Sequence, residues 1–243
     1  MYAVETKGLV KKYKTKTAVA GLDLAINEGE IYALLGVNGA GKTTTIRMLT
    51  CLSKPTDGEC YVCGKNCVTE MSEVKSITGI SPQDTAVAEN LTVTENLRLI
   101  CGIYEYYEEK TKRSVEEMIS LFGLEEYKNA RAKTLSGGWK RKLSIAMAMI
   151  GEPKVLFLDE PTLGLDVLAR RELWGVIEKL TGKITIVLTT HYMEEAEQLS
   201  NRIGVMINGE LKAQGTLSEL EAQTGEQGLE NVFVKIAEME GLK

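Results

Sequence analysis

Gly36-Val37-Asn38-Gly39-Ala40-Gly41-Lys42-Thr43 is the stretch that decides the fold of this chain. It fits the pattern G-x-x-x-x-G-K-[ST], in which backbone N–H groups close around phosphate oxygens and a Cβ at the glycine positions would obstruct them. Lys42 supplies a positive charge for the β- and γ-phosphates, and Thr43 offers its hydroxyl to Mg²⁺. An apolar strand precedes the loop and a helix follows it, which disfavours a glycine-rich turn without a ligand. The predicted nucleotide-binding residues are Gly36, Asn38, Gly39, Ala40, Gly41, Lys42, Thr43 and Thr44.

A second glycine loop, Leu135-Ser136-Gly137-Gly138, lies in the stretch TLSGGWKRK of residues 134–142. A helix is expected from about Trp139, so the backbone N–H groups of this loop and the helix dipole can also address an anion. Two phosphate-binding loops in one chain define a family much more narrowly than one loop does.

The composition is that of one large folded domain, because 44% of the 243 residues are hydrophobic. The net charge is −5 with acids and bases interspersed, and the basic cluster Lys140-Arg141-Lys142 is interpreted as a solvated helix face. No run approaches the ~18 apolar residues needed to cross a bilayer, and the N-terminus lacks the pattern of a signal peptide. We therefore expect a cytosolic protein and no nucleic-acid partner.

Five cysteines are expected to be reduced thiols. Cys60, Cys63 and Cys67 have a spacing that could suit zinc, but no fourth thiolate or histidine follows nearby, and residues 60–63 have the pattern of a strand. The zinc interpretation is therefore disfavoured.

Strands dominate the first third of the chain. Segments at residues 2–9, 18–26, 31–35 and 59–63 predict antiparallel strands beside a nucleotide-binding core. A short apolar run follows at residues 76–80, and the pattern from Thr92 to about Ala130 is helical. Thr92 and Glu95 have the spacing of a capping box at the start of this helical region.

Helices and strands alternate after Ser136, as expected of a parallel sheet. Strands are predicted at 154–158, 184–189 and 203–207, with helices at about 169–180 and 193–200. Asn208-Gly209 predicts a tight turn into a last strand at 210–213. The prediction is a single α/β domain over residues 1–243, with its core at about 1–91 and 151–243 and a helical subdomain at about 92–150.

Two acids end the apolar strand at 155–158, at the edge where parallel sheets bind ligands. Asp159 is predicted to hold Mg²⁺, and Glu160 to orient or deprotonate the attacking water. An acidic pair in this position is, by itself, more often a loop or helix cap, but the phosphate loop upstream favours the catalytic interpretation.

His191 is the only histidine, and it ends the strand at 184–190. It could hydrogen-bond the γ-phosphate and hold the catalytic carboxylate and water in line without changing its own charge. A lone histidine at a strand end is more often structural, but its place after the acidic strand favours a catalytic role.

From about Val4 to Phe233 the chain resembles the ATPase subunit of an ATP-binding cassette (ABC) transporter. The resemblance implies a P-loop NTPase (RecA-like) core with an N-terminal antiparallel β subdomain and a helical insertion, and ATP and Mg²⁺ as cofactors. It identifies Ser136, Gly137 and Gly138 as the loop that contacts the γ-phosphate of ATP bound to the other subunit of a head-to-tail dimer. The partner subunit would be a second copy or a sister ATPase.

Three further residues match family positions. Tyr13 resembles the aromatic residue that stacks on adenine, although one tyrosine alone is usually an ordinary strand residue. Gln83 resembles the glutamine that contacts Mg²⁺ and water and links ATP status to the membrane partner. Asp166 resembles the aspartate that connects the two ATP sites, and it can also be a helix N-cap.

Trp139 departs from the family pattern, which has glutamine or another polar or flexible residue there. We expect its side chain either to pack against the helical insertion or to stack near the ribose.

The resemblance implies a transport motor whose membrane-spanning subunits are separate polypeptides that dock between Gln83 and about Tyr107. The chain would then lie at the inner face of the cell membrane. The segments after His191 and Asn208 resemble bacterial exporter ATPases for drugs, antibiotics, peptides or polysaccharides. The alternative is a non-transport ABC ATPase that acts on DNA or ribosomes. Such proteins usually carry tandem cassettes, long coiled coils or zinc modules. A P-loop kinase would leave the second loop, His191 and Gln83 unexplained.

Overall fold

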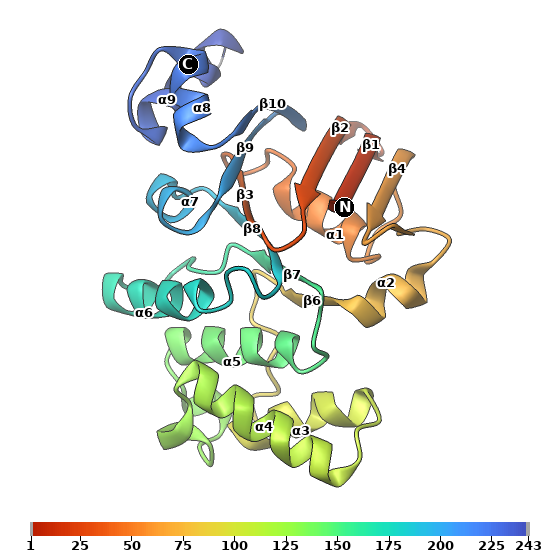
Figure 1. Ribbon diagram of the computed structural model, residues 1–243, viewed down its shortest axis with the longest axis vertical. Helices are drawn as coiled ribbons and strands as arrows, with labels where there is room; N and C mark the ends of the chain where they lie inside the picture. Colours follow the sequence, from red (N-terminus) through yellow and green to blue (C-terminus); the bar gives the residue numbers. More distant parts are fainter. Residues whose placement is uncertain (1, 242–243) are drawn as a thin grey trace.

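Two sheets organise the protein in a computed structural model that describes residues 2–241 (Figure 1). The smaller sheet is antiparallel, with the order β2-β1-β4-β5. Its strands are β1 (Tyr2–Tyr13), β2 (Lys16–Asn27), β4 (Asp57–Val62) and β5 (Lys65–Asn66). The first two strands run further than their apolar segments predict because they form one continuous hairpin interrupted by bulges.

The larger sheet has six strands in the order β10-β9-β3-β8-β7-β6. These strands are β3 (Ile31–Leu35), β6 (Thr78–Ser81), β7 (Val155–Asp159), β8 (Thr185–Thr190), β9 (Arg202–Ile207) and β10 (Glu210–Gly215). All neighbours are parallel except β10, which pairs antiparallel with β9 through the predicted Asn208-Gly209 turn. Both turn residues have positive φ, as a type I′ turn requires.

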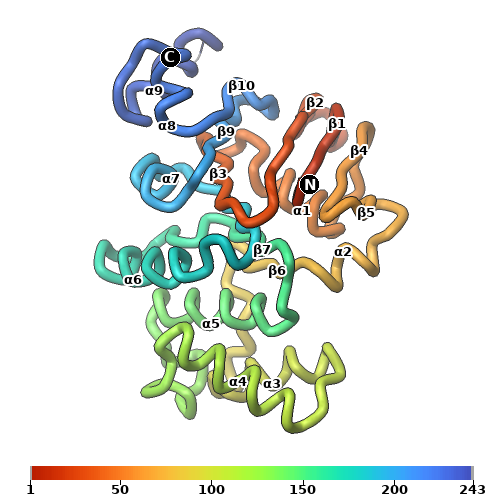
Figure 2. Tube along the Cα trace, in the orientation of Figure 1, coloured from red at the N-terminus to blue at the C-terminus, as the bar shows by residue number. Residues whose placement is uncertain are grey.

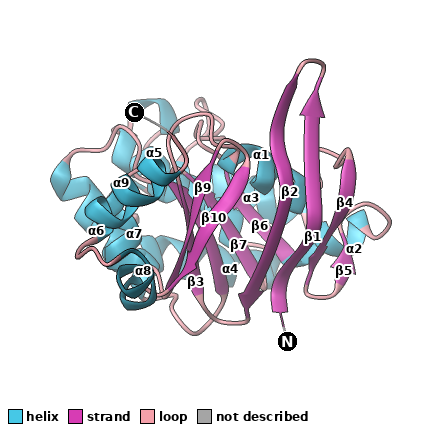
Figure 3. Ribbon diagram, turned by 90° about the horizontal axis from the view of Figure 1, so that it is seen from above, coloured by secondary structure: helices cyan, strands magenta, loops and turns pink. Residues whose placement is uncertain are grey.

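Strands β3, β7 and β8 are buried on both faces, and their side chains alternate between two hydrophobic cores. Ile31, Ala33 and Leu35 face the core beneath the later helices. Tyr32 and Leu34 face the second core, which lies between this sheet and the antiparallel sheet. In Figure 3 the antiparallel strands β1, β2 and β4 form one layer beside the central sheet, and helices α5 to α9 lie on its other side.

Helices cover the larger sheet and extend from it. They are α1 (Lys42–Leu49), α2 (Met71–Ile77), α3 (Val93–Ile103), α4 (Glu108–Phe122), η1 (Glu125–Tyr127), η2 (Ala132–Thr134), α5 (Gly137–Met149), α6 (Val167–Glu178), α7 (Met193–Leu199), α8 (Leu217–Thr224) and α9 (Leu229–Met239). Helices α3 and α4 pack on α5 at one end of the molecule, and α8 and α9 lie at the other end (Figure 2).

The predicted capping box at the start of α3 is confirmed, because Thr92 accepts from the Glu95 N–H and the Glu95 carboxylate accepts from the Thr92 N–H. Helices α5 and α6 each begin two residues earlier than predicted, with Ser136 and Asp166 as their N-caps. The Asp166 carboxylate accepts two backbone N–H groups of the first turn of α6, so the N-cap role is confirmed. Helices α2, α8 and α9 were not predicted.

The interpretation of residues 140–142 as a solvated helix face is wrong. Arg141 and Lys142 are only 4% and 7% exposed. Arg141 donates to the carbonyl oxygens of Pro82 and Gln83, and Lys142 forms an ion pair with Glu172 of α6. Neighbouring segments cover both cations, and the sequence alone did not reveal this because their partners are 30 to 59 positions away.

Candidate nucleotide site

The predicted phosphate loop, acids and histidine meet at one edge of the larger sheet. Strands β3, β8 and β7 are neighbours, and their register pairs Leu35 with Thr190 and Asp159 with Thr189. The segments that leave the carboxyl ends of these three strands therefore emerge side by side. Strand β3 leads into the phosphate loop, β7 leads to Glu160, and β8 leads to His191.

The phosphate loop needs glycine at both of its pattern positions. A Cβ on Gly36 would collide with the carbonyl oxygen of Met206, and a Cβ on Gly41 would collide with that of Ala18. Gly41 also has φ of 107°, a conformation that other residues rarely adopt. The backbone therefore wraps closely before α1 begins at Lys42, with the N-terminal N–H groups of the helix beside the loop.

Lys42 is nearly buried, and its ammonium group contacts three oxygens. It donates to the carbonyl oxygens of Gly36 at 2.7 Å and Val37 at 3.3 Å, and Nζ lies 3.1 Å from Glu160 Oε1. The two carbonyl groups therefore hold the ammonium group within the phosphate loop. Phosphate oxygens of a bound nucleotide would contact the same ammonium group.

Thr43 and Asp159 bring oxygen atoms close together beside the phosphate loop. Thr43 Oγ1 donates to Asp159 Oδ1 at 2.9 Å, and Thr189 Oγ1 donates to the same oxygen at 2.6 Å. Mg²⁺ prefers such hard oxygen ligands and commonly combines one or two carboxylates with phosphate oxygens. The residues present therefore fit Mg²⁺ bound together with a nucleotide.

Glu160 links the phosphate loop to His191. Its Oε2 lies 2.7 Å from His191 Nδ1, while Oε1 faces Lys42. Glu160 has φ of 48°, a strained conformation for a residue with a side chain, and its N–H bonds to the backbone and side-chain oxygens of Thr189. The two bonds to β8 hold this strained backbone, so the carboxylate is fixed between a cation and an imidazole.

A cavity of about 490 Å³ joins most of the predicted residues. Tyr13 and Gln83, which are far apart in sequence, line it together with the phosphate loop, Glu160 and His191. Sequence reasoning missed Lys16, whose Nζ lies next to Gly39 in the same cavity. The sequence could have indicated Lys16, because a two-residue turn after Tyr13 pairs Lys16 with Tyr13 across the hairpin.

The structure does not bring the second loop into this cavity. Gly137 lies beside Leu165, and Gly138 lies beside Ala169 of α6. Ser136, Gly137 and Gly138 are thus next to the loop that carries Asp166, and none of these four residues lines the cavity that contains Lys42.

Trp139 stacks on Tyr127 of η1, with ring centroids 4.4 Å apart. Lys142 Nζ lies over the same indole, 4.1 Å from the ring centroid, and the indole also packs against the hydrophobic core. Tyr127 belongs to the predicted helical subdomain, so the structure favours packing against this region over a position near the ribose.

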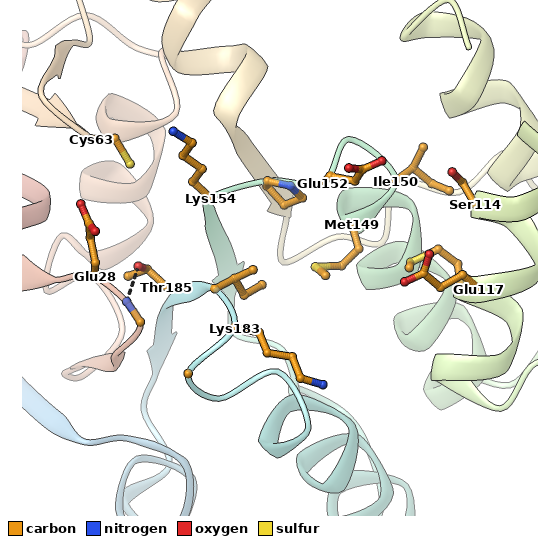
Figure 4. A pocket seen from close by; sticks show the side chains of 15 residues that line it. Glu28, Cys63, Ser114, Glu117, Met149, Ile150, Glu152, Lys154, Lys183 and Thr185 are labelled. Atoms are coloured by element: carbon orange, nitrogen blue, oxygen red, sulfur yellow. Dashed lines mark hydrogen bonds between the residues drawn. The ribbon is translucent and has the colours of Figure 1, made fainter. Parts of the chain in front are cut away.

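A second cavity, of about 800 Å³, lies at the opposite edge of the sheet (Figure 4). It is lined by the amino ends of β7 and β8 and by α4, and the dashed line in Figure 4 marks the 2.9 Å bond from the Gly29 N–H to Thr185 Oγ1. No predicted site residue lines it. Cys63 does, whereas Cys60 and Cys67 are buried in the second core.

The model of the family described as "ABC transporter" matches residues 19–163. The chain belongs to this family. The ABC cassette described above is 42% identical to the daunorubicin/doxorubicin resistance ATP-binding protein DrrA of Streptomyces peucetius, with 92% of the chain aligned to 68% of that protein. It is also 42% identical to human phospholipid-transporting ATPase ABCA3, with 87% of the chain aligned to only 12% of that longer protein.

Solved structures of other ABC ATPases have the same fold. An ATP-binding subunit of an ABC transporter matches with a TM-score of 0.87 and 30% identity, over 97% of this chain and 99% of that one. The ATP-binding cassette MJ0796, described as a dimer in a post-hydrolysis state bound to ADP and Pi, matches with a TM-score of 0.79 and 28% identity, over 88% and 98%. The chain is therefore an ABC ATPase. Within residues 2–241 there is no helix with the length and apolar character that membrane crossing requires.

Proposed function

We propose that this ABC ATPase is the motor of an exporter: it binds ATP and Mg²⁺ in the cavity beside Lys42, pairs head-to-tail with a second copy or a sister ATPase, and drives separate membrane subunits from the inner face of the membrane. The observation that carries the proposal is the convergence of Lys42, Glu160 and His191 around one cavity. Asp159 lies behind it and is hydrogen-bonded to Thr43, which lines the cavity.

The chemistry follows from the role of each side chain. Bound Mg²⁺ would neutralise the phosphate charge that develops during hydrolysis, with Thr43, Asp159 and Gln83 as its candidate protein contacts. Glu160 accepts the proton of the attacking water or orients that water, and His191 holds the carboxylate in line through the 2.7 Å bond. Lys42 stabilises the γ-phosphate and forms an ion pair with Glu160.

The position of the second loop supports a site shared between two chains. Ser136, Gly137 and Gly138 lie outside the cavity of their own chain and beside the Asp166 loop. Exposed apolar side chains flank both regions, with Val37 in the phosphate loop and Val167 and Leu168 at the start of α6. Such exposed apolar groups are typical of a surface that a protein partner covers.

We propose that a membrane subunit docks in a groove next to Gln83. A concavity of about 270 Å³ runs between β6, α3 and α5, and apolar residues such as Ile80, Ile100 and Ile103 line it. Ile103 at the end of α3 is 69% exposed, and Tyr107 nearby is 64% exposed. Because Arg141 binds the carbonyls of Pro82 and Gln83 beside this groove, a partner seated there could sense the nucleotide site.

Relatives support export over a role on DNA or ribosomes. DrrA is named for drug resistance, and ABCA3 is named for phospholipid transport. We propose that the complex that contains this chain exports a drug-like or lipid cargo.

The test is co-purification from gently solubilised membranes of the native cells. The tagged chain should retain a polytopic membrane protein in stoichiometric amount, and Ile103→Asp should lose it because a carboxylate would be buried in the apolar groove. Val234→Asp, at an exposed apolar position of α9, is the matched control and should retain the partner. Recovery of ribosomal proteins or DNA-repair factors without a membrane protein would refute the proposal.

A further inference from the structure

Arg170, Tyr192 and His191 form a stack that ends at Glu160. The rings of His191 and Tyr192 lie 4.1 Å apart between centroids, at an interplanar angle of 39°. The Arg170 guanidinium carbon lies 4.5 Å from the centroid of the Tyr192 ring. Because His191 Nδ1 lies 2.7 Å from Glu160 Oε2, the stack connects α6 to the carboxylate that we propose as the base.

Arg170 has little else to bind. Its Nε is buried and has no hydrogen-bond partner in the described part of the chain, and Nη1 lies 3.8 Å from Glu194, a carboxylate that is 66% exposed. A pair with one exposed partner contributes little at that distance. The face of the Tyr192 ring is therefore the contact that accounts for the position of the guanidinium.

Trp174 lies one helical turn after Arg170 and holds the same face of α6 against α7. Trp174 Nε1 donates to Glu195 Oε1 of α7 at 3.3 Å, and both side chains are buried. Positions 170 and 174 share one face of a helix, so α6 contacts the His191 segment and α7 at two points. Because Asp166 is the N-cap of α6, a displacement of the Asp166 loop would reach the His191 ring through rigid elements.

We propose that Arg170 is a positioning residue for ATP hydrolysis, acting through Tyr192 to hold the imidazole of His191 toward Glu160. This inference rests on the proposed ATPase function. The imidazole is 27% exposed, so without the stacked ring it gains freedom to rotate away from the carboxylate. Loss of the stack lowers the fraction of bound ATP that is in a reactive arrangement, while Lys42 and the phosphate loop still bind ATP.

The test compares kcat and KM for ATP in Arg170→Met and Arg171→Met. Methionine keeps the apolar stem of arginine and removes its charge. Arg171 is the exposed neighbour on the same helix, so the charge change is matched. We expect Arg170→Met to lower kcat about 3- to 10-fold with KM within about twofold, as loss of one partly buried cation–π contact predicts, and Arg171→Met to match the wild type.

Conservative variants separate positioning from packing. Arg170→Lys should restore most of the lost kcat because it returns a cation to the ring, and Tyr192→Phe should keep wild-type kcat because it keeps the ring. Tyr192→Leu should reproduce the loss, and it provides the measurement if Arg170→Met does not fold. Equal kcat in Arg170→Met and Arg171→Met, or an effect on KM alone, would overturn the inference. A wild-type protein without ATPase activity would overturn the proposed function itself.

Discussion

Glu160→Gln replaces the carboxylate between Lys42 and His191 with an amide of the same shape. The side chain is 6% exposed, and its two oxygens lie 3.1 Å from Lys42 Nζ and 2.7 Å from His191 Nδ1. The amide cannot accept the proton of a water molecule, but its oxygen can still accept one hydrogen bond. We therefore expect hydrolysis to fail while the fold and the phosphate loop persist.

The size of the effect follows from the role of the group. A positioned general base contributes about 10²- to 10⁴-fold to a rate, equivalent to about 3–5 kcal/mol of barrier. ATP should bind at least as tightly as in the wild type, because the substitution removes a negative charge from a nearly buried site next to the triphosphate and leaves Lys42 unpaired. The variant should therefore accumulate as an ATP-bound dimer.

Two assays measure these outcomes. Steady-state phosphate release gives kcat, and light scattering with saturating ATP and Mg²⁺ gives the mass in solution. Glu116→Gln, an exposed carboxylate on α4, is the control for loss of one charge and should behave as the wild type. Turnover within about tenfold of the wild type would refute the assignment of Glu160 as base. A variant that binds ATP yet stays monomeric would refute the site shared between two chains.

Three further outcomes are expected. Lys42→Ala should abolish ATP binding or hydrolysis, measured by nucleotide titration and phosphate release, because it removes the cation held by the loop carbonyls. Trp139→Gln should lower the melting temperature by a few degrees, since the stack on Tyr127 is worth about 0.5–1.5 kcal/mol, and an unchanged melting temperature would contradict that packing. Burial raises the pKa of Glu195, so its contribution to stability is present below the unfolded pKa and declines as pH rises through the folded pKa. Glu195→Gln should therefore become more stable relative to the wild type as pH rises from about 4 to 8. The measurement is the melting temperature of both proteins across that range, and a difference in melting temperature that does not change with pH would contradict the reasoning.

Local chemistry explains which parts of the fold the sequence predicted. The phosphate loop, the apolar strands β3, β7 and β8, the Asn208-Gly209 turn and the Thr92 capping box each depend on residues within a few positions of one another. Helix α2 was missed because its seven residues bury only Val74 and show no clear apolar face. Residues 140–142 were misassigned because a run of charges has the same local pattern whether its partners are water or buried oxygens.

The sequence by itself determined the candidate residues, because phosphate binding requires specific residue types at fixed spacing. Only the tertiary structure decided how they meet. Tyr13 and Gln83 reach one cavity across 70 positions, Glu160 lies between Lys42 and His191, and the second loop lies outside that cavity. The reason is physical: neighbouring parallel strands bring their carboxyl ends to one edge, and strand order is set by long-range pairing and burial that no local pattern encodes. The contact between Arg170 and Tyr192 also depends on the tertiary structure, because only the packing of α6 beside the end of β8 brings those two side chains together.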